Sequence, residues 1–167
     1  AVVVPFADQV TTTTASSVVP YNAGWMDSRQ QYMIRADELQ LLLGQNGGSI
    51  NSLAFELTTL PVCAGCAGKF NGFTISMAQT NAASLTAPLP LNQFSTVFSP
   101  SGGLLFSALN LGWNTHQFST PFVWDGVSNV VVQVCFDNAA YGSTPGVRTT
   151  ATSWPSVYYG YADLSTA

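Results

Sequence analysis

Charged residues are scarce in this sequence. Asp, Glu, Lys and Arg make up 7% of its 167 residues, whereas an average soluble domain carries about 25%. The net charge is −4, and four basic residues are too few to form a phosphate-binding surface. We therefore expect no nucleic acid partner. A surface built mainly from Ser, Thr, Asn, Gln and Gly repels its own copies weakly, which suits self-assembly or work outside the cell.

Long apolar runs are also missing. No stretch approaches the roughly 18 apolar residues that span a bilayer, so we predict no transmembrane segment. The first residues do not combine a basic region with an apolar stretch, and we expect a mature form from which any signal peptide has been removed. A chain of 167 residues is long enough for one domain with a sizeable core.

Catalytic signatures are absent as well. The single histidine, His116, has no Gly-x-Ser-x-Gly elbow to work with, and Ser101 lies in an ordinary loop sequence, SPSGG. We therefore interpret His116 as a strand residue at the sheet surface. Glu56 could belong to a glycosidase pair, which needs two acids about 5–10 Å apart. Solvated surface acids explain the eight carboxylates better, so the sequence predicts no enzyme.

Metal-ligating patterns are weak. Oxygen ligands of the kind that calcium prefers flank one expected strand at Asp125, Asn129, Asp137 and Asn138. A strand of eight or so residues separates its two ends by over roughly 20 Å, so we do not expect one four-ligand site. Asp125 fits a turn with Gly126 better, where its side chain accepts bonds from nearby backbone N–H groups. We predict no cofactor, with calcium as the one alternative.

The chain has three cysteines, Cys63, Cys66 and Cys135. The CAGC spacing matches half of a zinc site or a redox motif, but a second Cys/His pair is missing and the chain does not read as an α/β fold. The remaining interpretations are a small loop pinned by a Cys63–Cys66 disulfide and a pairing of either residue with Cys135. The sequence leaves both open.

Apolar residues recur with a period of two, which is typical of half-buried antiparallel strands. The alternation is clear in INSLAFEL (50–57), FTISMAQ (73–79) and NVVVQVCF (129–136), and turn-forming sequences separate these segments. ADELQLLLG (36–44) instead predicts one or two helical turns at the end of the fold, stopped by Gly44. The pattern predicts an all-β, jelly-roll-like antiparallel sandwich.

The first twenty residues differ from the rest, because they are rich in β-branched residues and contain one charge, Asp8. We divide the chain into an extended arm, 1–20, and a sandwich, 21–167. The arm is either the first edge strand of its own sandwich or a strand that completes the sheet of a neighbour. In the second case its contacts would be Val2, Val3, Val4, Phe6, Val10, Thr12 and Thr14.

Aromatic residues gather in or beside the expected loops. Exposed rings would form a platform for stacking against sugars, and we predict such a platform from Trp113, Trp124 and Tyr158. Other candidates are Trp25, Trp154, Tyr159 and Tyr161. The alternative is that these rings cover the ends of the core.

Four segments carry a resemblance: 30–57, 73–80, 112–141 and 156–163. The most specific part, 112–138, has a Gly-Trp pair followed by TPF, a DG turn and a strand that ends in CFDN. This pattern resembles a β-sandwich domain of secreted Bacteroidetes surface proteins, which are commonly exported by the type IX secretion system and include large adhesins. The resemblance implies export, a jelly-roll-like sandwich and a binding or structural role, and it implies no catalytic residues.

Together these features predict a non-enzymatic extracellular or cell-surface protein. The first hypothesis is a subunit of a surface filament, in which the arm of one copy adds a strand to the sheet of the next. Such a head-to-tail contact does not close and can build a polymer. The alternative is a glycan-binding or adhesin module of a secreted surface protein.

Overall fold

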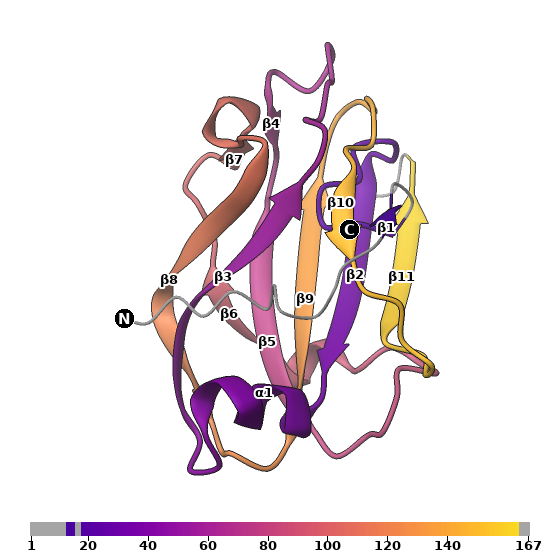
Figure 1. Cartoon of the computed structure of the whole chain (residues 1–167). Coiled ribbons are helices and arrows are strands. Elements are labelled where there is room, and N and C mark those ends of the chain that lie inside the picture. Colours follow the sequence, from indigo (N-terminus) through magenta and orange to yellow (C-terminus); the bar gives the residue numbers. More distant parts are fainter. Residues whose placement is uncertain (1–12, 16–17, 164–167) are drawn as a thin grey trace.

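The computed structural model describes residues 13–15, as backbone, and 18–163. Two antiparallel sheets face each other across one core, as the sequence predicts (Figure 1). The first sheet has the order β1-β10-β3-β8, with bounds Thr13–Ala15, Val147–Thr149, Gly48–Leu57 and Gly112–Trp124. The second has the order β11-β2-β9-β5-β6, with bounds Val157–Ala162, Asp27–Ile34, Asn129–Asp137, Thr74–Thr80 and Ser95–Phe98.

The shorter elements lie around these sheets. A two-stranded ribbon pairs β4 (Lys69–Phe70) with β7 (Leu104–Leu105), and two 3-10 turns span Leu91–Gln93 and Phe106–Ala108. Helix α1 (Ala36–Leu43) covers one end of the sandwich (Figure 1). In the described part of the chain, no helix is long and apolar enough to cross a membrane.

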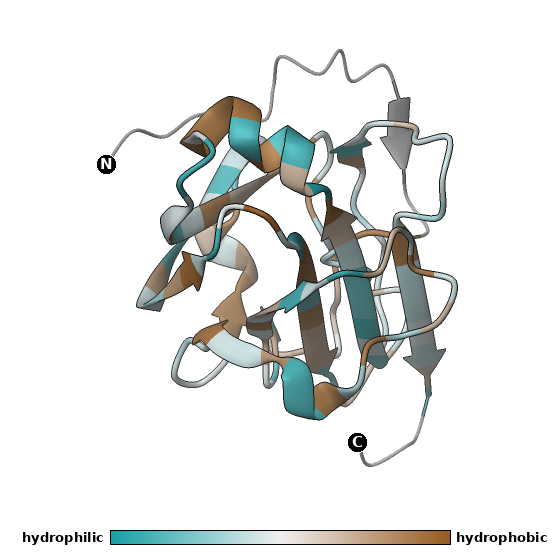
Figure 2. Cartoon of the chain, turned by 90° about the horizontal axis from the view of Figure 1, so that it is seen from below, coloured by the Kyte–Doolittle hydropathy of each residue, from teal (hydrophilic) through white to brown (hydrophobic). Residues whose placement is uncertain are grey.

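The core follows the predicted alternation. Val130, Val132 and Val134 of β9 are buried between the sheets together with Ile75 and Met77 of β5. Figure 2 shows that apolar and polar residues are interspersed along the strands and the helix, as a two-layer fold requires. Alternate residues of both strands therefore lie in the core between the sheets, although most residues on the other face of each strand are buried as well.

The outer face of the second sheet is also partly covered. Met33 and Val131 are buried there beneath Leu85, and Trp154 packs against the same cluster. Gln31 fixes the covering segment, because its side chain donates to the carbonyl oxygen of Leu89 over 3.1 Å and accepts from its N–H over 2.8 Å. The segment around Leu85 and Leu89 thus forms a third layer on part of the sandwich.

Helix α1 begins and ends at the residues that the sequence predicts. The Glu38 side chain accepts a bond from the backbone N–H of Arg35 over 2.7 Å, which satisfies one of the free donors at the start of the helix. Gly44 follows the last turn with φ of 81°, a left-handed conformation that favours glycine. Leu39 is the buried residue that holds the helix on the core.

Candidate ligand-binding site: an aromatic cleft beside strand β11

Strand β11 is the last strand of the five-stranded sheet and is paired with β2. Its register places Tyr159 opposite Gln30 and Tyr161 opposite Ser28. Gln30 and Ser28 lie on the same face of β2 as Tyr32, which packs against the core between the sheets, so the two tyrosine side chains project on the inner side of the sheet, at its edge. Because side chains alternate along a strand, Tyr159 and Tyr161 both lie on the inner face of β11.

Trp25 completes this group from the loop before β2. Its ring lies parallel to that of Tyr161, with a centroid distance of 5.5 Å and an interplanar angle of 3°, and the ring of Tyr159 lies 5.1 Å from that of Tyr161. Trp25 is 41% exposed and Tyr159 is 52% exposed. Three neighbouring rings therefore meet, and two of them present large accessible surfaces.

One of the three rings, Tyr161, is held in place by the buried side chain of Gln30. The Gln30 amide donates to the Tyr161 hydroxyl over 3.1 Å and to the Ser28 hydroxyl over 3.0 Å, while the Tyr32 hydroxyl donates to the Gln30 carbonyl oxygen. Burial raises the pKa of Tyr161, so its hydroxyl stays neutral at physiological pH. The network fixes the orientation of Tyr161 without placing a charge in the cleft.

A polar wall faces the rings. Asn22 accepts a bond from the Thr144 hydroxyl over 2.6 Å and one from the backbone N–H of Gly24 over 3.1 Å. A Cβ at Gly24 would lie 2.7 Å from the Thr144 hydroxyl, so the wall packs closely. The cleft has a volume of about 450 Å³ and is lined by Val18, Asn22, Gly24, Trp25, Thr144, Tyr159 and Tyr161.

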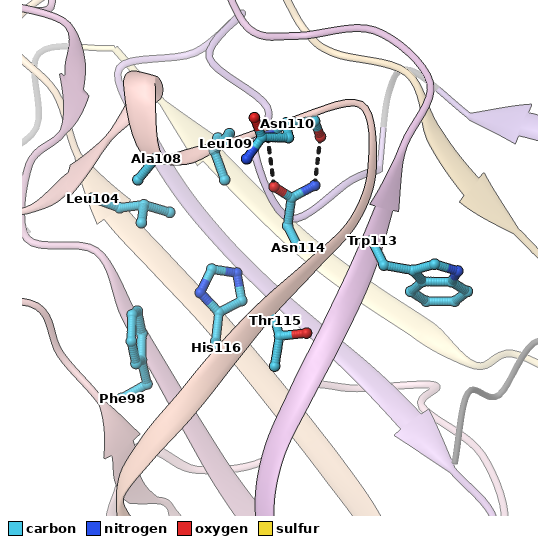
Figure 3. A pocket seen from close by; sticks show the side chains of 9 residues that line it. All are labelled: Phe98, Leu104, Ala108, Leu109, Asn110, Trp113, Asn114, Thr115 and His116. Carbon is cyan, nitrogen blue, oxygen red and sulfur yellow. Dashed lines mark hydrogen bonds between the residues drawn. The ribbon is translucent and has the colours of Figure 1, made fainter. Parts of the chain in front are cut away.

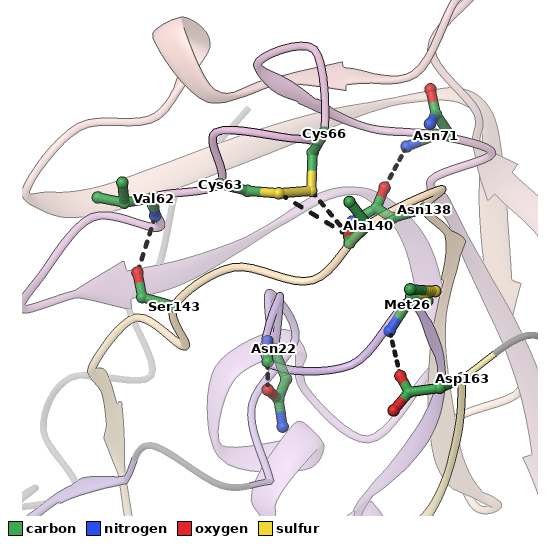
Figure 4. The surroundings of a disulfide bond; sticks show 11 residues. Asn22, Met26, Val62, Cys63, Cys66, Asn71, Asn138, Ala140, Ser143 and Asp163 are labelled. Atoms are coloured by element: carbon green, nitrogen blue, oxygen red, sulfur yellow. Dashed lines mark hydrogen bonds between the residues drawn. A yellow bond between two sulfur atoms is a disulfide. The ribbon is translucent and has the colours of Figure 1, made fainter.

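A disulfide loop is hydrogen-bonded to Ser143, the residue before Thr144 (Figure 4). The structure joins Cys63 to Cys66, both buried, and Cys135 is a free, half-buried thiol. The disulfide loop is tied to the segment that carries Thr144, because Ser143 donates its backbone N–H to the Val62 carbonyl oxygen over 2.6 Å. The Ser143 hydroxyl also accepts the Val62 N–H over 2.9 Å. The disulfide therefore supports the polar wall from outside the cleft.

The predicted glycan platform is not assembled. Trp124 is 1% exposed and donates its indole N–H to the Ser128 carbonyl oxygen over 2.7 Å, so it cannot stack against a sugar. Trp113 is exposed on β8 of the four-stranded sheet, whereas Tyr158 is exposed on the outer face of β11. The prediction is corrected on these points: Trp124 is a core residue, and Trp113 and Tyr158 lie on different sheets.

His116 lies in the core, not at the sheet surface as predicted. Its Nε2 lies 2.5 Å from the Tyr21 hydroxyl, and the rings of Phe55, Phe73 and Phe98 surround it. Burial lowers the pKa of His116 to about 4. The structure gives it a neutral, hydrogen-bonded place among aromatic rings.

A smaller cavity of about 270 Å³ lies beside His116. Figure 3 shows Trp113 pointing away from His116, on the other side of strand β8. Asn114 closes the adjacent loop, because its amide donates to the Asn110 carbonyl oxygen over 2.7 Å and its carbonyl oxygen accepts the Asn110 N–H over 2.8 Å. These polar groups are used in holding the loop, so we do not interpret this cavity as the functional site.

The residues considered for calcium serve the fold. Asp125 accepts the backbone N–H groups of Val127 and Ser128 over 2.9 and 2.8 Å, which is the predicted turn. Asn129 and Asn138 each accept a backbone N–H bond with the side-chain oxygen. Across residues 18–163, no group of three or more His, Cys, Asp or Glu side chains is placed to hold a metal ion.

Two acidic residues, Asp137 on β9 and Glu56 on β3, make contacts outside the cleft. Asp137 lies opposite Asp27 in the pairing of β9 with β2. Glu56 forms an ion pair with Arg148, with 3.8 Å between Oε1 and Nε. Neither acid lines the aromatic cleft.

The predicted arm contacts fall into two groups. Val2, Val3, Val4, Phe6, Val10 and Thr12 lie outside the described residues. Thr14 pairs with Arg148 of its own chain, in the register of β1 with β10. Val19, within the predicted arm, is fully buried in the core. At Thr14 the chain therefore forms an edge strand of its own sheet, which is the first of the two alternatives for the arm.

No protein-family model, curated protein or solved structure matches the chain. The cleft is therefore interpreted from its own chemistry. It offers aromatic faces for stacking and uncharged amide and hydroxyl groups for hydrogen bonding. Its lining, within the described residues, contains no Asp, Glu, Lys, Arg or His.

Proposed function

We propose that this protein binds glycans in the cleft of Trp25, Tyr159 and Tyr161, as a non-catalytic module of an extracellular or cell-surface protein. The observation that carries the proposal is the contact of three rings, two of them widely exposed, beside the hydrogen-bonded pair of Asn22 and Thr144.

The chemistry of a sugar ring fits this arrangement. A pyranose has faces of C–H groups that pack against aromatic rings and an equator of hydroxyl groups that need hydrogen-bond partners. Ligand sites typically combine an apolar, aromatic lining with a few polar groups and occupy about 300–1,000 Å³. The volume of about 450 Å³ falls within this range and suits one or two sugar units.

The lining also favours binding over catalysis. Glycoside hydrolysis normally needs two carboxyl groups about 5–10 Å apart, and the seven described residues that line the cleft contain none. Neutral glycans are the preferred class, because this lining provides no cation to pair with a sulfate or a uronate.

Two features support the proposed location. The first is the export implied by the resemblance that the sequence analysis drew for the segments 30–57, 73–80, 112–141 and 156–163. The buried Cys63–Cys66 disulfide fits an oxidising compartment, where such bonds persist.

A glycan array followed by calorimetric titration of the strongest ligand tests this function. Trp25→Ala should weaken binding at least tenfold, because it removes one exposed stacking face. Trp113→Ala is the matched control, since Trp113 is an exposed tryptophan on the other sheet, and it should change the affinity less than twofold. An array without binding, or equal losses in both variants, would remove the proposal.

Self-assembly by strand addition, the first hypothesis from the sequence, is a second candidate. It is favoured by the open edge of β11, which within the described residues is paired only with β2, and by the low charge of the chain. Deleting residues 1–12 keeps β1 in place and should abolish any polymer seen by light scattering and negative-stain imaging. Polymers that form unchanged would exclude the arm as their connector.

A further inference from the structure

His116 uses only one of its two ring nitrogens within the described part of the fold. Its Nε2 lies 2.5 Å from the Tyr21 hydroxyl, and no described residue forms a hydrogen bond with its Nδ1. The side chain is only 3% exposed, so bulk water reaches little of it. Because a buried polar atom without a partner is costly, Nδ1 needs a partner from outside the described chain.

The bond to Tyr21 decides which ring nitrogen carries the proton. Tyr21 is fully buried, and burial raises its pKa, so its hydroxyl stays protonated. Within residues 18–163, Nε2 of His116 is the acceptor that this hydroxyl reaches, so Tyr21 donates and Nε2 accepts. Burial also lowers the pKa of His116 to about 4, so the imidazole is neutral at physiological pH. Its single proton therefore lies on Nδ1, which is a hydrogen-bond donor.

This donor faces the cavity of about 270 Å³. The cavity is lined by β6 and β8, which are the last strands of the two sheets, and by β7 and the 3-10 turn that follows it. Figure 3 shows Nδ1 of His116 on the side of Phe98 and Leu104. Leu104 and Leu109 are buried, whereas Ala108 is exposed at the rim. The cavity is therefore an apolar pocket with an N–H group at its inner end.

The pocket suits a small neutral molecule with one acceptor oxygen. An apolar cavity of about 150 Å³ binds benzene, so about 270 Å³ has room for a ring with a short substituent. Asn114 and Asn110 bond each other, which leaves Nδ1 of His116 for the ligand. The described residues that line the pocket include no Asp, Glu, Lys or Arg. A charged ligand would therefore lose its water without gaining an opposite charge.

We propose that this pocket is a second binding site, for a small ketone, ester or lactone whose apolar body packs beside Leu104 and Leu109 and whose oxygen accepts the Nδ1–H of His116. The pocket and the aromatic cleft share no described lining residue. The proposal is therefore independent of glycan binding, and either site can fail its test without the other.

A matched pair of probes tests the ligand chemistry. Acetophenone carries a carbonyl oxygen on an apolar ring, and α-methylstyrene has the same shape with a CH₂ group in place of that oxygen. Titration of the full-length chain, followed by NMR, should show that acetophenone binds at least tenfold more tightly. Equal affinities would overturn the role of His116, and no binding of acetophenone up to its solubility limit would overturn the site.

The nitrogen resonances of the imidazole test the donor directly. In the free protein at pH 7, they should show the proton on Nδ1 of His116. Acetophenone should shift the Nδ1 resonance, and α-methylstyrene should shift it less. A proton on Nε2, or equal shifts with both probes, would overturn the proposed hydrogen bond.

Three variants locate the site. Ala108→Phe fills the rim and should weaken the binding of acetophenone at least tenfold. Ala87→Phe is the matched control, because Ala87 is an exposed alanine that does not line the pocket, and it should change the affinity less than twofold. His116→Phe keeps a ring but removes the N–H, so acetophenone should lose its advantage over α-methylstyrene. Equal effects of Ala108→Phe and Ala87→Phe would overturn the location, even if His116→Phe does not fold.

Discussion

The Tyr21 hydroxyl and Nε2 of His116 lie 2.5 Å apart inside the core, where both side chains are buried. Burial lowers the pKa of His116 from 6.5 to about 4, so the folded protein holds a neutral imidazole. Because the unfolded chain binds this proton more readily, stability is complete above about pH 6.5 and falls as the pH drops toward 4.

The first prediction follows from this lowered pKa. Between pH 7 and pH 4, His116 should cost up to about 3 kcal/mol of unfolding free energy, because each tenfold difference in proton affinity between the two states is worth about 1.4 kcal/mol. Urea denaturation of the wild type and of His116→Gln at several pH values measures the slope. His116→Gln should lose the part of the pH dependence that His116 causes, whatever the absolute stability of the variant. If the unfolding free energies of the two proteins change with pH in parallel, His116 is not the group responsible.

The second prediction concerns the facing acids Asp27 and Asp137. Desolvation and the neighbouring Asp27 carboxyl raise the pKa of Asp137. A raised pKa means that the folded state favours the protonated acid, so this pair is most favourable at low pH and loses stability as the pH rises through the folded pKa. Asp137→Asn should therefore stabilise the protein at pH 7 by about 0.2–1 kcal/mol. Urea denaturation at pH 7 and pH 3 checks that the gain disappears in acid.

The third prediction concerns the disulfide. Replacing both Cys63 and Cys66 with serine should lower the unfolding free energy by about 2 kcal/mol, because a short loop loses its cross-link. Cys135→Ser removes a free thiol outside this loop and should cost less than about 1 kcal/mol. Chemical denaturation of the two variants measures the difference. Equal stabilities would show that the cross-link contributes nothing beyond the packing of its sulfur atoms.

The fourth prediction tests the brace between the disulfide loop and the polar wall. A Cβ at Gly142 would lie 2.2 Å from the Val62 carbonyl oxygen, whereas a Cβ at Gly160 meets nothing within 4 Å. Gly142→Ala should destabilise the protein by about 1–3 kcal/mol through overpacking. Gly160→Ala should have almost no effect or a small stabilising one. Thermal unfolding of both variants measures these effects. If Gly142→Ala leaves the stability unchanged, the segment around Gly142 can move away from Val62 without cost.

The sandwich itself was predictable from local pattern. Apolar residues recur with a period of two in the segments 50–57, 73–79 and 129–136, and each segment contributes a strand to the sandwich. Helix α1 was also predictable, since acidic residues begin it and Gly44 ends it. Both features depend on residues that are close together in the chain, so they can be predicted from the sequence alone.

The errors at His116 and Trp124 have one origin. Both belong to β8, a strand of 13 residues in which the even positions from Asn114 to Trp124 include the buried ones. Pro121 lies within this strand, which is tolerated because β8 is the last strand of its sheet. The proline and the following DG turn resemble loop sequence and hide the alternation that would have placed both residues inside.

The aromatic cleft was only half visible in the sequence. Tyr159 and Tyr161 are two residues apart, so alternation alone places them on one face of a strand. Trp25 joins them because β11 pairs with β2, strands from opposite ends of the chain. That pairing depends on the topology of the whole sandwich, which no local pattern records.

Tyr159 and Tyr161 each contribute a ring to the cleft, and both lie on the last strand of the five-stranded sheet. If copies assembled by adding a strand to this edge, the added strand and a guest that stacks on the rings would therefore compete for the same place. Copies inside a chain of subunits would have this site filled, and a free site would remain only at the acceptor end of each chain.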